Sequence, residues 1–428
     1  MHPTPRSRGV VAVATLFAVT AALAGCGPAD DGRVQLDFFQ FKGEAAQDFR
    51  DIVADFEAAN PDIDVVINQV PDPDTALRTL LVKDRVPDVL TVNGSAYYGD
   101  LAKAGIFYDF SGEPIVDTVN PAVLDILDAL GTAAPGEINA LPMANNALGV
   151  IYNREIFAEH GLEVPTTWDE LMDVCERLKA AGVAPFYATA ADAWTTLEPF
   201  LTLGPEIQPD DFFPRLREEG ASVGPDSSVS FQKDYPEVFE KMGVLYDQYA
   251  QDGWRSRGYD DGNAAFARGE SAMYVMGIWS FSQILANDPD IELGMFPMPG
   301  TDDPEDRLIV TGVDVAVTIG RDTAHPEEAL RFVNYLLSPE TVARYTESQV
   351  ALSPLADAPP PSFDALREIT PFFEAGKISG FLDHQIPAAF PLQQILQQFF
   401  FDADATAAME RLDKEWARFA ARSYSEDS

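Results

Sequence analysis

The order in which apolar segments follow one another constrains the fold of this chain more than any other feature. Residues 34–41 have the composition of a β-strand, and residues 44–59 carry apolar side chains at the spacing of a helix. The alternation continues with a strand-like segment over 63–70, a helix around 76–81 and a strand over 89–92. Strands and helices that alternate in this way predict an α/β fold with a mostly parallel sheet, covered by helices on both faces.

The loops that follow the strands of such a sheet are the expected place for a ligand. In open α/β sheets, ligands bind outside the carboxyl ends of the strands. This rule selects residues 41–43 after the first strand and residues 93–95 after the third strand. Phe41, Asn93 and the nearby Tyr97 are therefore candidate ligand-binding residues.

The N-terminal segment indicates where the protein works. Arg6 and Arg8 precede an apolar run over residues 10–23, which is shorter than the roughly 20 residues that a membrane-spanning helix needs. A basic start, a short apolar middle and a small-residue cleavage site are typical of a secretory signal peptide. Cys26 directly follows Leu-Ala-Gly. This arrangement resembles the lipobox of bacterial lipoproteins, which implies that a lipid on Cys26 anchors the mature chain to the cell membrane, outside the cytoplasm.

Composition excludes several classes of function. The 428 residues are 46% hydrophobic, which allows a large core and two or more domains without disulfides. A formal charge of −40 repels phosphate backbones, so we expect no nucleic-acid partner. Cys175 lies in an apolar stripe at helical spacing and is expected to be buried. His160, His325 and His384 are widely separated, so we expect no zinc site, and we predict no other metal and no cofactor.

Four sequence stretches stand out in the later two thirds of the chain. They are LP at 141–142 followed by GVIYNREIF at 149–157, PTTWDEL at 165–171 followed by AGVAP at 181–185, FARGESAM at 266–273 followed by GIW at 277–279, and GVD at 312–314 followed by ALRFVNYLLSPE at 329–340. In this order, and after a lipobox, they resemble the family 1 extracellular solute-binding proteins, the sugar-capturing lipoproteins of ABC importers. The resemblance covers nearly the whole mature chain.

The resemblance implies a two-lobed α/β fold of the periplasmic-binding-protein kind (type II), with the ligand in a cleft between the lobes. Carried onto this sequence, it predicts these parts: a signal peptide at 1–25, a tether at 26–32, lobe 1 at 33–141 plus 309–346, and lobe 2 at 142–308 plus 347–428. It also places the crossover segments that act as hinges near 140–146, 298–309 and 346–354. Prolines such as Pro142 are expected to interrupt regular structure there.

Aromatic rings are the first candidates for sugar binding, because a sugar presents flat faces of C–H groups. Trp279 follows Gly277 and falls on the Gly-x-Trp position of the family. Trp194 lies in a polar stretch over residues 188–196 and resembles the second cleft tryptophan of the family. Trp254 is expected to be structural.

Amides and acids are the second group of candidates, because they form paired hydrogen bonds with sugar hydroxyls. Asn145 and Asn146 lie at the first expected crossover. Asp314 follows Gly312, a small residue that lets a ligand approach the backbone. An acid in an otherwise apolar strand is costly unless it is paired, which favours a cleft position for Asp314. Gln349 completes the candidate set.

The candidates contain few basic residues, and Lys42 and Arg344 are interpreted as surface cations. This composition favours a neutral or cationic ligand over phosphate or sulfate, and a neutral carbohydrate fits best. The resemblance implies a monomeric, non-enzymatic receptor that delivers sugar to the permease subunits of an ABC importer.

Two alternatives remain open. One is an exported carbohydrate-active enzyme, which needs two carboxylates about 5 to 9 Å apart. The other is a binder of a metal ion, polyol or cationic small molecule on the same fold, with Tyr97 and Tyr98 resembling the tyrosine pair of iron binders.

Overall fold

The computed structural model describes residues 32–43, 45–69, 73–83, 85–387 and 390–426, so the lipidation candidate Cys26 lies outside the described residues. The strands in the described part are β1 (Val34–Gln40), β2 (Ile63–Gln69), β3 (Val89–Val92), β4 (Leu141–Asn153), β5 (Ala184–Tyr187), β6 (Ser271–Gly277), β7 (Leu293–Phe296), β8 (Ile309–Ile319) and β9 (Ile378–Gly380). The strands predicted near the N-terminus of the mature chain are confirmed as β1, β2 and β3.

The sheet is mixed, which corrects the prediction of a mostly parallel one. Its strand order is β2-β1-β3-β8-β4-β6-β5, with β7 paired to β4 and β9 paired to β8. β1 is parallel to β2 and β3, and β5 is parallel to β6. However, β4 is antiparallel to β6, β7 and β8, and β8 is antiparallel to β3. The prediction was wrong because local alternation reports only consecutive strand–helix–strand units, and β4 and β8 belong to none.

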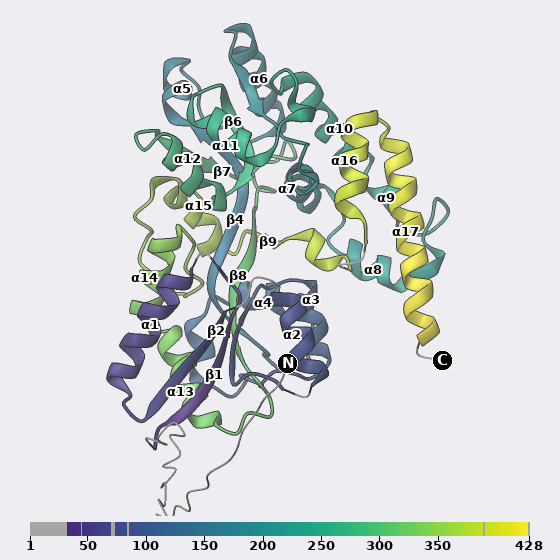
Figure 1. The fold of residues 1–428 in the computed structure, drawn as a ribbon. Helices are drawn as coiled ribbons and strands as arrows, with labels where there is room; N and C mark the ends of the chain where they lie inside the picture. Colours follow the sequence, from purple (N-terminus) through teal and green to yellow (C-terminus); the bar gives the residue numbers. More distant parts are fainter. Residues whose placement is uncertain (1–31, 44, 70–72, 84, 388–389, 427–428) are drawn as a thin grey trace, which may run out of the picture.

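β4 and β8 pass through both halves of the sheet (Figure 1). β8 pairs with β9 at its start and with β3 at its end, and β4 pairs with β6 and β7 along its second half. We use lobe 1 for the half that contains β1, β2 and β3, and lobe 2 for the half that contains β5, β6 and β7. Contrary to expectation, Pro142 does not interrupt β4. The register of β4 against β8 shifts between Pro142 and Asn145, and proline is tolerated in strands at such irregularities.

Helices cover both faces of the lobe 1 sheet, as predicted. They are α1 (Ala46–Ala59), α2 (Pro73–Val82), α3 (Ala96–Lys103), α4 (Pro121–Leu130), α13 (Pro326–Leu336) and α14 (Pro339–Gln349). Figure 1 shows α1, α13 and α14 on one face and α2, α3 and α4 on the other. The side chains of α1 that face the sheet, such as Phe49 and Phe56, are buried against β1 and α13.

Lobe 2 is richer in helices. They are α5 (Arg154–Glu159), α6 (Trp168–Ala180), α7 (Glu198–Ile207), α8 (Phe212–Glu219), α9 (Phe231–Asp234), α10 (Pro236–Gly243), α11 (Tyr259–Ala267), α12 (Phe281–Asn287), α15 (Asp364–Glu374), α16 (Leu392–Asp402) and α17 (Ala405–Glu426). Cys175 is fully buried on α6, as predicted, and burial raises the pKa of its thiol. In the part of the chain that the structure describes, no helix has both the length and the apolar character needed to cross a lipid bilayer.

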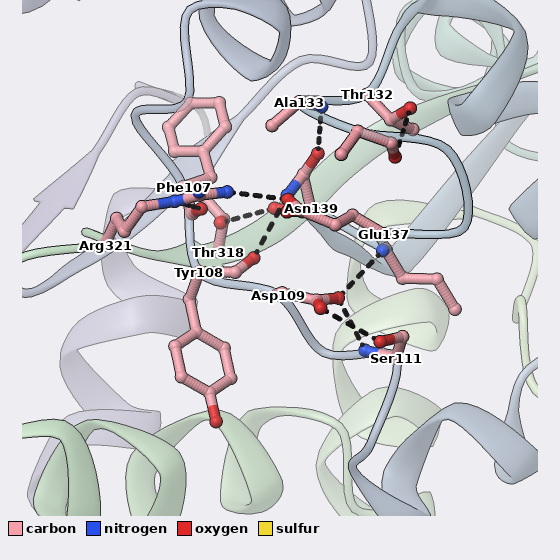
Figure 2. Close-up of polar contacts among 12 residues, drawn as sticks. Phe107, Tyr108, Asp109, Ser111, Thr132, Ala133, Glu137, Asn139, Thr318 and Arg321 are labelled. Carbon is pink, nitrogen blue, oxygen red and sulfur yellow. Dashed lines mark hydrogen bonds and ion pairs between the residues drawn. The ribbon is translucent and has the colours of Figure 1, made fainter.

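A polar network fixes the point at which β4 begins (Figure 2). Asn139, which is buried, accepts from the amide of Ala133 at 2.9 Å and donates to Glu137 Oε2 at 3.0 Å. The hydroxyl of Thr318 on β8 donates to the carbonyl of Asn139 at 2.6 Å. Arg321, just after β8, pairs with Glu137 at 2.6 Å. The loop between α4 and β4 is therefore bonded to Thr318 within β8 and to Arg321 just after it.

Candidate functional site

The pairing of β4 with β8 brings Asn146 and Asp314 together. Asn146 lies opposite Gly312 in the ladder, so Asp314 is its diagonal neighbour on the same face of the sheet. The Nδ2 of Asn146 donates to Oδ1 of Asp314 at 3.1 Å.

Asn145 points to the opposite face, because successive side chains of a strand alternate. Its Nδ2 donates to the hydroxyl of Thr311 at 3.2 Å, and the residue is fully buried. The two adjacent amides that the sequence grouped together are therefore separated. Asn146 lies beside Asp314, and Asn145 belongs to the packing behind it.

Lobe 1 supplies the ionic partner of Asp314. The ammonium of Lys42, which follows β1, forms an ion pair with Oδ2 of Asp314, and the two side chains are only 11% and 9% exposed. The Nδ2 of Asn93, which follows β3, donates to the carbonyl of Asp314 at 3.3 Å. Asp314 is thus paired, as its apolar strand required. Lys42 is a shielded cation, not the surface cation that the sequence favoured, whereas Arg344 is exposed and pairs with Asp55 at 2.6 Å.

Trp279 is held in place by the glycine that precedes it by two residues. It lies in the turn Ile278–Ser280 after β6, and its ring folds back over Gly277. A Cβ at Gly277 would lie 2.0 Å from Cζ3 of Trp279, so a side chain there would displace the indole. This is a physical reason for the Gly-x-Trp pattern.

Phe381 connects Trp279 to the strand pair. Its ring centroid is 6.2 Å from that of Trp279 and 5.3 Å from that of His384. The Phe381 ring also covers Gly312 of β8, where a Cβ would come within 2.4 Å of it. The predicted residues Trp279 and Gly312 therefore meet through an aromatic residue that the sequence did not single out.

A hollow of about 370 Å³ lies between the lobes. On the lobe 1 side it is bordered by the start of α3, with Ser95, Ala96 and Tyr97. On the lobe 2 side it is bordered by Leu197 and by the turn Leu382–Gln385, with Asp383 and His384. Tyr97 also borders a smaller hollow of about 30 Å³ together with Phe41 and Asn93. The three candidates from the strand-end loops are thus gathered on the lobe 1 side. A hollow of about 420 Å³ elsewhere, between α4, α14 and α15, contains none of the candidates.

Two neighbouring acids were not found from the sequence: Asp383 borders this hollow, and Glu198 lies behind it, close enough for the charge of Asp383 to act on it. Glu198, the first residue of α7, is 3% exposed, and burial followed by the charge of Asp383 raises the pKa of Glu198 well above its ordinary value. Among the described residues, neither Oε2 of Glu198 nor Oδ1 of Asp383 has a hydrogen-bond partner, although both atoms are buried. Such acceptors are costly to bury and are suited to ligand hydroxyls. An acid at a helix start looks ordinary in sequence, and only its apolar surroundings (TLEPFL) were a signal.

The remaining candidates lie apart from this group. The ring of Trp194 meets that of Tyr259 edge to face at 4.9 Å. Glu198 is close enough to Tyr259 to help raise its pKa, after the larger effect of burial, so Trp194 is linked to the acids through Tyr259. Gln349 ends α14 and donates to Asp48 of α1 at 2.7 Å, so it is not brought to the other candidates. Trp254 is buried, as expected.

The tyrosine pair does not form a common site. Tyr98 is 2% exposed, and its ring stacks on Phe107 with a centroid distance of 5.8 Å, so it is a core residue. Tyr97 lies under the guanidinium of Arg78 at 4.7 Å. Over the described ranges, no three or more His, Cys, Asp or Glu side chains are grouped so that they could hold a metal ion.

Comparison with known proteins leads to the same family as the sequence motifs. A family model described as bacterial extracellular solute-binding protein matches residues 42–343. The multiple sugar-binding protein of Streptococcus mutans is 27% identical over 344 residues, which is 79% of this chain and 79% of the relative.

Solved structures match over nearly the whole chain. The apo form of RafE from Streptococcus pneumoniae is 26% identical, with a TM-score of 0.81 and coverage of 92% of this chain and 99% of that one. RafE in complex with raffinose is 26% identical, with a TM-score of 0.74 and coverage of 90% and 100%. The expected α/β, two-lobed type II fold of periplasmic sugar-binding proteins is confirmed.

Proposed function

Because the chain belongs to the bacterial extracellular solute-binding proteins, we propose that it captures a sugar or an oligosaccharide between its lobes and delivers it to the permease of an ABC importer. It acts as a monomeric receptor and not as an enzyme. RafE, which is 26% identical to this chain, has been solved in complex with raffinose, and this supports a sugar as the class of ligand.

The observation that carries the proposal is the meeting of rings and unpaired acceptors at the boundary of the two lobes. Trp279 and Phe381 supply apolar faces for sugar C–H groups. Glu198 and Asp383 supply buried acceptor atoms without partners in the described structure. Asn146, beside Asp314, supplies an amide on the face of the strand pair that Phe381 covers.

Closure of the lobes follows from the position of these groups. Lys42 and Asn93 reach the site from lobe 1, and Trp279 and Glu198 reach it from lobe 2. A ligand that touches both walls binds the closed state better than the open state, and this difference in affinity drives closure. Because a transport receptor must also release its ligand, we expect a dissociation constant of about 1 μM, or roughly −8 kcal/mol.

The proposal is tested by thermal unfolding and calorimetry with a panel of mono- and oligosaccharides. A bound sugar raises the melting temperature by mass action. Trp279→Ala should weaken binding by at least about tenfold, or ~1.4 kcal/mol, while the far-UV spectrum is unchanged. Phe401→Ala is the matched control, because Phe401 is an exposed aromatic residue, 47% accessible. Absence of any shift across the panel would contradict the sugar ligand.

The buried Glu198 and its neighbour Asp383 give the enzyme alternative one specific point to test. Two neighbouring carboxylates, one with a raised pKa, are the residues that a glycosidase needs. We expect oligosaccharides incubated with the protein to be recovered intact by chromatography. Release of shorter sugars that disappears in Glu198→Gln would establish the enzyme instead.

A further inference from the structure

A second hollow, of about 400 Å³, adjoins the one described above. Lobe 1 borders it with α3 and the end of α4, and lobe 2 borders it with α8, the turn Leu382–Gln385 and the C-terminal helix α17. The two hollows share Ala96 of lobe 1 and His384, Ile386 and Pro387 of lobe 2. We call this second hollow the outer chamber.

The outer chamber is large enough for a ligand group of its own. Small-molecule sites generally occupy about 300–1,000 Å³, so either hollow alone falls in this range. The side chain on the lobe 1 side of the shared boundary is the methyl group of Ala96, which leaves more room than any larger side chain would. A ligand seated at the first hollow therefore has a continuation toward α17.

The walls of the outer chamber combine donors with apolar surface. Arg217 of α8 donates to the neutral Oε1 of Gln385 at 3.3 Å. The side chain of Lys103 lies against Gly131, where a Cβ would meet its Cε at 2.3 Å. Within the described residues, neither cation forms an ion pair. The outer chamber therefore has two cationic side chains that no carboxylate pairs with in the described structure.

The helix α17 supplies the apolar side. Trp416 and Phe419 border the chamber, and the indole Nε1–H of Trp416 is already used by the carbonyl of Leu216 at 3.0 Å. Trp416 therefore offers ring surface and no free donor. Asp100 of α3 adds a carboxylate acceptor. Donors, an acceptor and ring surface in one hollow are the combination that a sugar unit requires.

We propose that the outer chamber binds the distal unit of an oligosaccharide whose first part occupies the hollow between Tyr97 and His384. The inference rests on the proposed sugar-binding function. It assigns Arg217, Lys103 and α17 to the selection of ligand length, and it makes the natural ligand an oligosaccharide and not a monosaccharide.

The test is calorimetry with sucrose, raffinose and stachyose, a series that grows by one sugar unit at a time, and with malto-oligosaccharides of matching lengths. Arg217→Gln should weaken the affinity for the longest bound sugar by about tenfold. The affinity for the shortest bound sugar should stay within about twofold of the wild-type value. Lys103→Gln, which changes the lobe 1 wall of the outer chamber and not the wall of the first hollow, should show the same dependence on length. Arg215→Gln is the matched control, because Arg215 lies on the same helix and bonds to Asp211 and Ser228.

The outcomes separate the two proposals. If the wild-type protein binds no sugar of any length, the proposed function fails, and the chamber proposal fails with it. If sugars bind but the two variants affect all lengths equally, or affect none, only the outer chamber is refuted. A length-dependent loss in both variants, absent in Arg215→Gln, supports it.

Discussion

At the scale of single residues, the absence of one methyl group at Gly277 decides where the indole of Trp279 lies. We expect Gly277→Ala to push the ring away from Phe381 and to weaken sugar binding by about tenfold, or ~1.4 kcal/mol, because a Cβ there would lie 2.0 Å from the ring. Calorimetry measures the affinity, and tryptophan fluorescence reports the displaced indole. Gly224→Ala is the control, because a Cβ at Gly224 meets nothing within 4 Å. An unchanged affinity in Gly277→Ala would remove the ring position from the binding account.

Residue types predicted part of the site, and the reasons for success and failure are physical. Asp314 was expected in the cleft because an unpaired acid in an apolar strand is too costly, and the structure pairs it with Lys42. The partner Lys42 was not recognised, since its neighbour is 272 positions away and no local pattern reports such contacts. Glu198 and Asp383 were missed for the same reason. Whether the gathered residues bind sugar is still a prediction.

At the scale of elements, Glu206 at the end of α7 forms hydrogen bonds with the loop between β7 and β8. Its carboxylate accepts from the amide of Gly300 at 2.7 Å and from the amide of Leu308 at 3.2 Å. Burial raises the pKa of Glu206 from 4.5 to about 8, and the two amide bonds offset only part of that shift. The folded state therefore holds a proton that the unfolded chain releases near pH 4.5.

The raised pKa of Glu206 gives stability a defined dependence on pH. Its contribution is fully present below about pH 4.5, decreases as pH rises, and is lost above about pH 8. We expect Glu206→Gln to flatten the fall in melting temperature over this interval, measured by thermal unfolding at several pH values. Thr202→Ser, on the same helix α7, removes no titrating group and should leave the slope unchanged. An identical slope in wild type and Glu206→Gln would contradict the assignment.

The loop that precedes β4 depends on Asn139 (Figure 2). Asn139→Ala should lower the free energy of unfolding by about 1 kcal/mol, because the half-buried amide of Ala133 loses its acceptor. Urea unfolding measures the change. Thr132→Ala, which removes one exposed hydrogen bond in the same loop, is the control and should cost less than about 0.5 kcal/mol.

The elements themselves were largely predictable, and their connectivity was not. Apolar spacing located β1, α1, β2 and β3, because each buries one face within a short window. The same spacing cannot reveal that β4 runs antiparallel to β8, since that pairing joins segments more than 160 positions apart. The expectation that Pro142 breaks the strand failed, because Pro142 lies at a shift in register, where strands tolerate a residue without an amide donor.

At the scale of the whole molecule, attachment to the membrane depends on Cys26, which we propose carries the lipid anchor. Cys26→Ser should release the protein into the medium or the periplasm, because none of the described helices can cross a bilayer. Fractionation followed by immunoblotting measures the change, and Cys175→Ser is the control with one cysteine removed elsewhere. Membrane attachment that persists in Cys26→Ser would contradict the anchor. Sugar affinity should be equal in both forms.

The long strands β4 and β8 also have a consequence for inheritance. Since both strands contribute to both lobes, no continuous stretch of the gene encodes a whole lobe. A single recombination breakpoint between two related genes would therefore pair a β4 strand from one protein with a β8 strand from the other. We expect new ligand preferences to arise in such receptors through scattered point substitutions on the facing walls, and rarely through the exchange of an intact module.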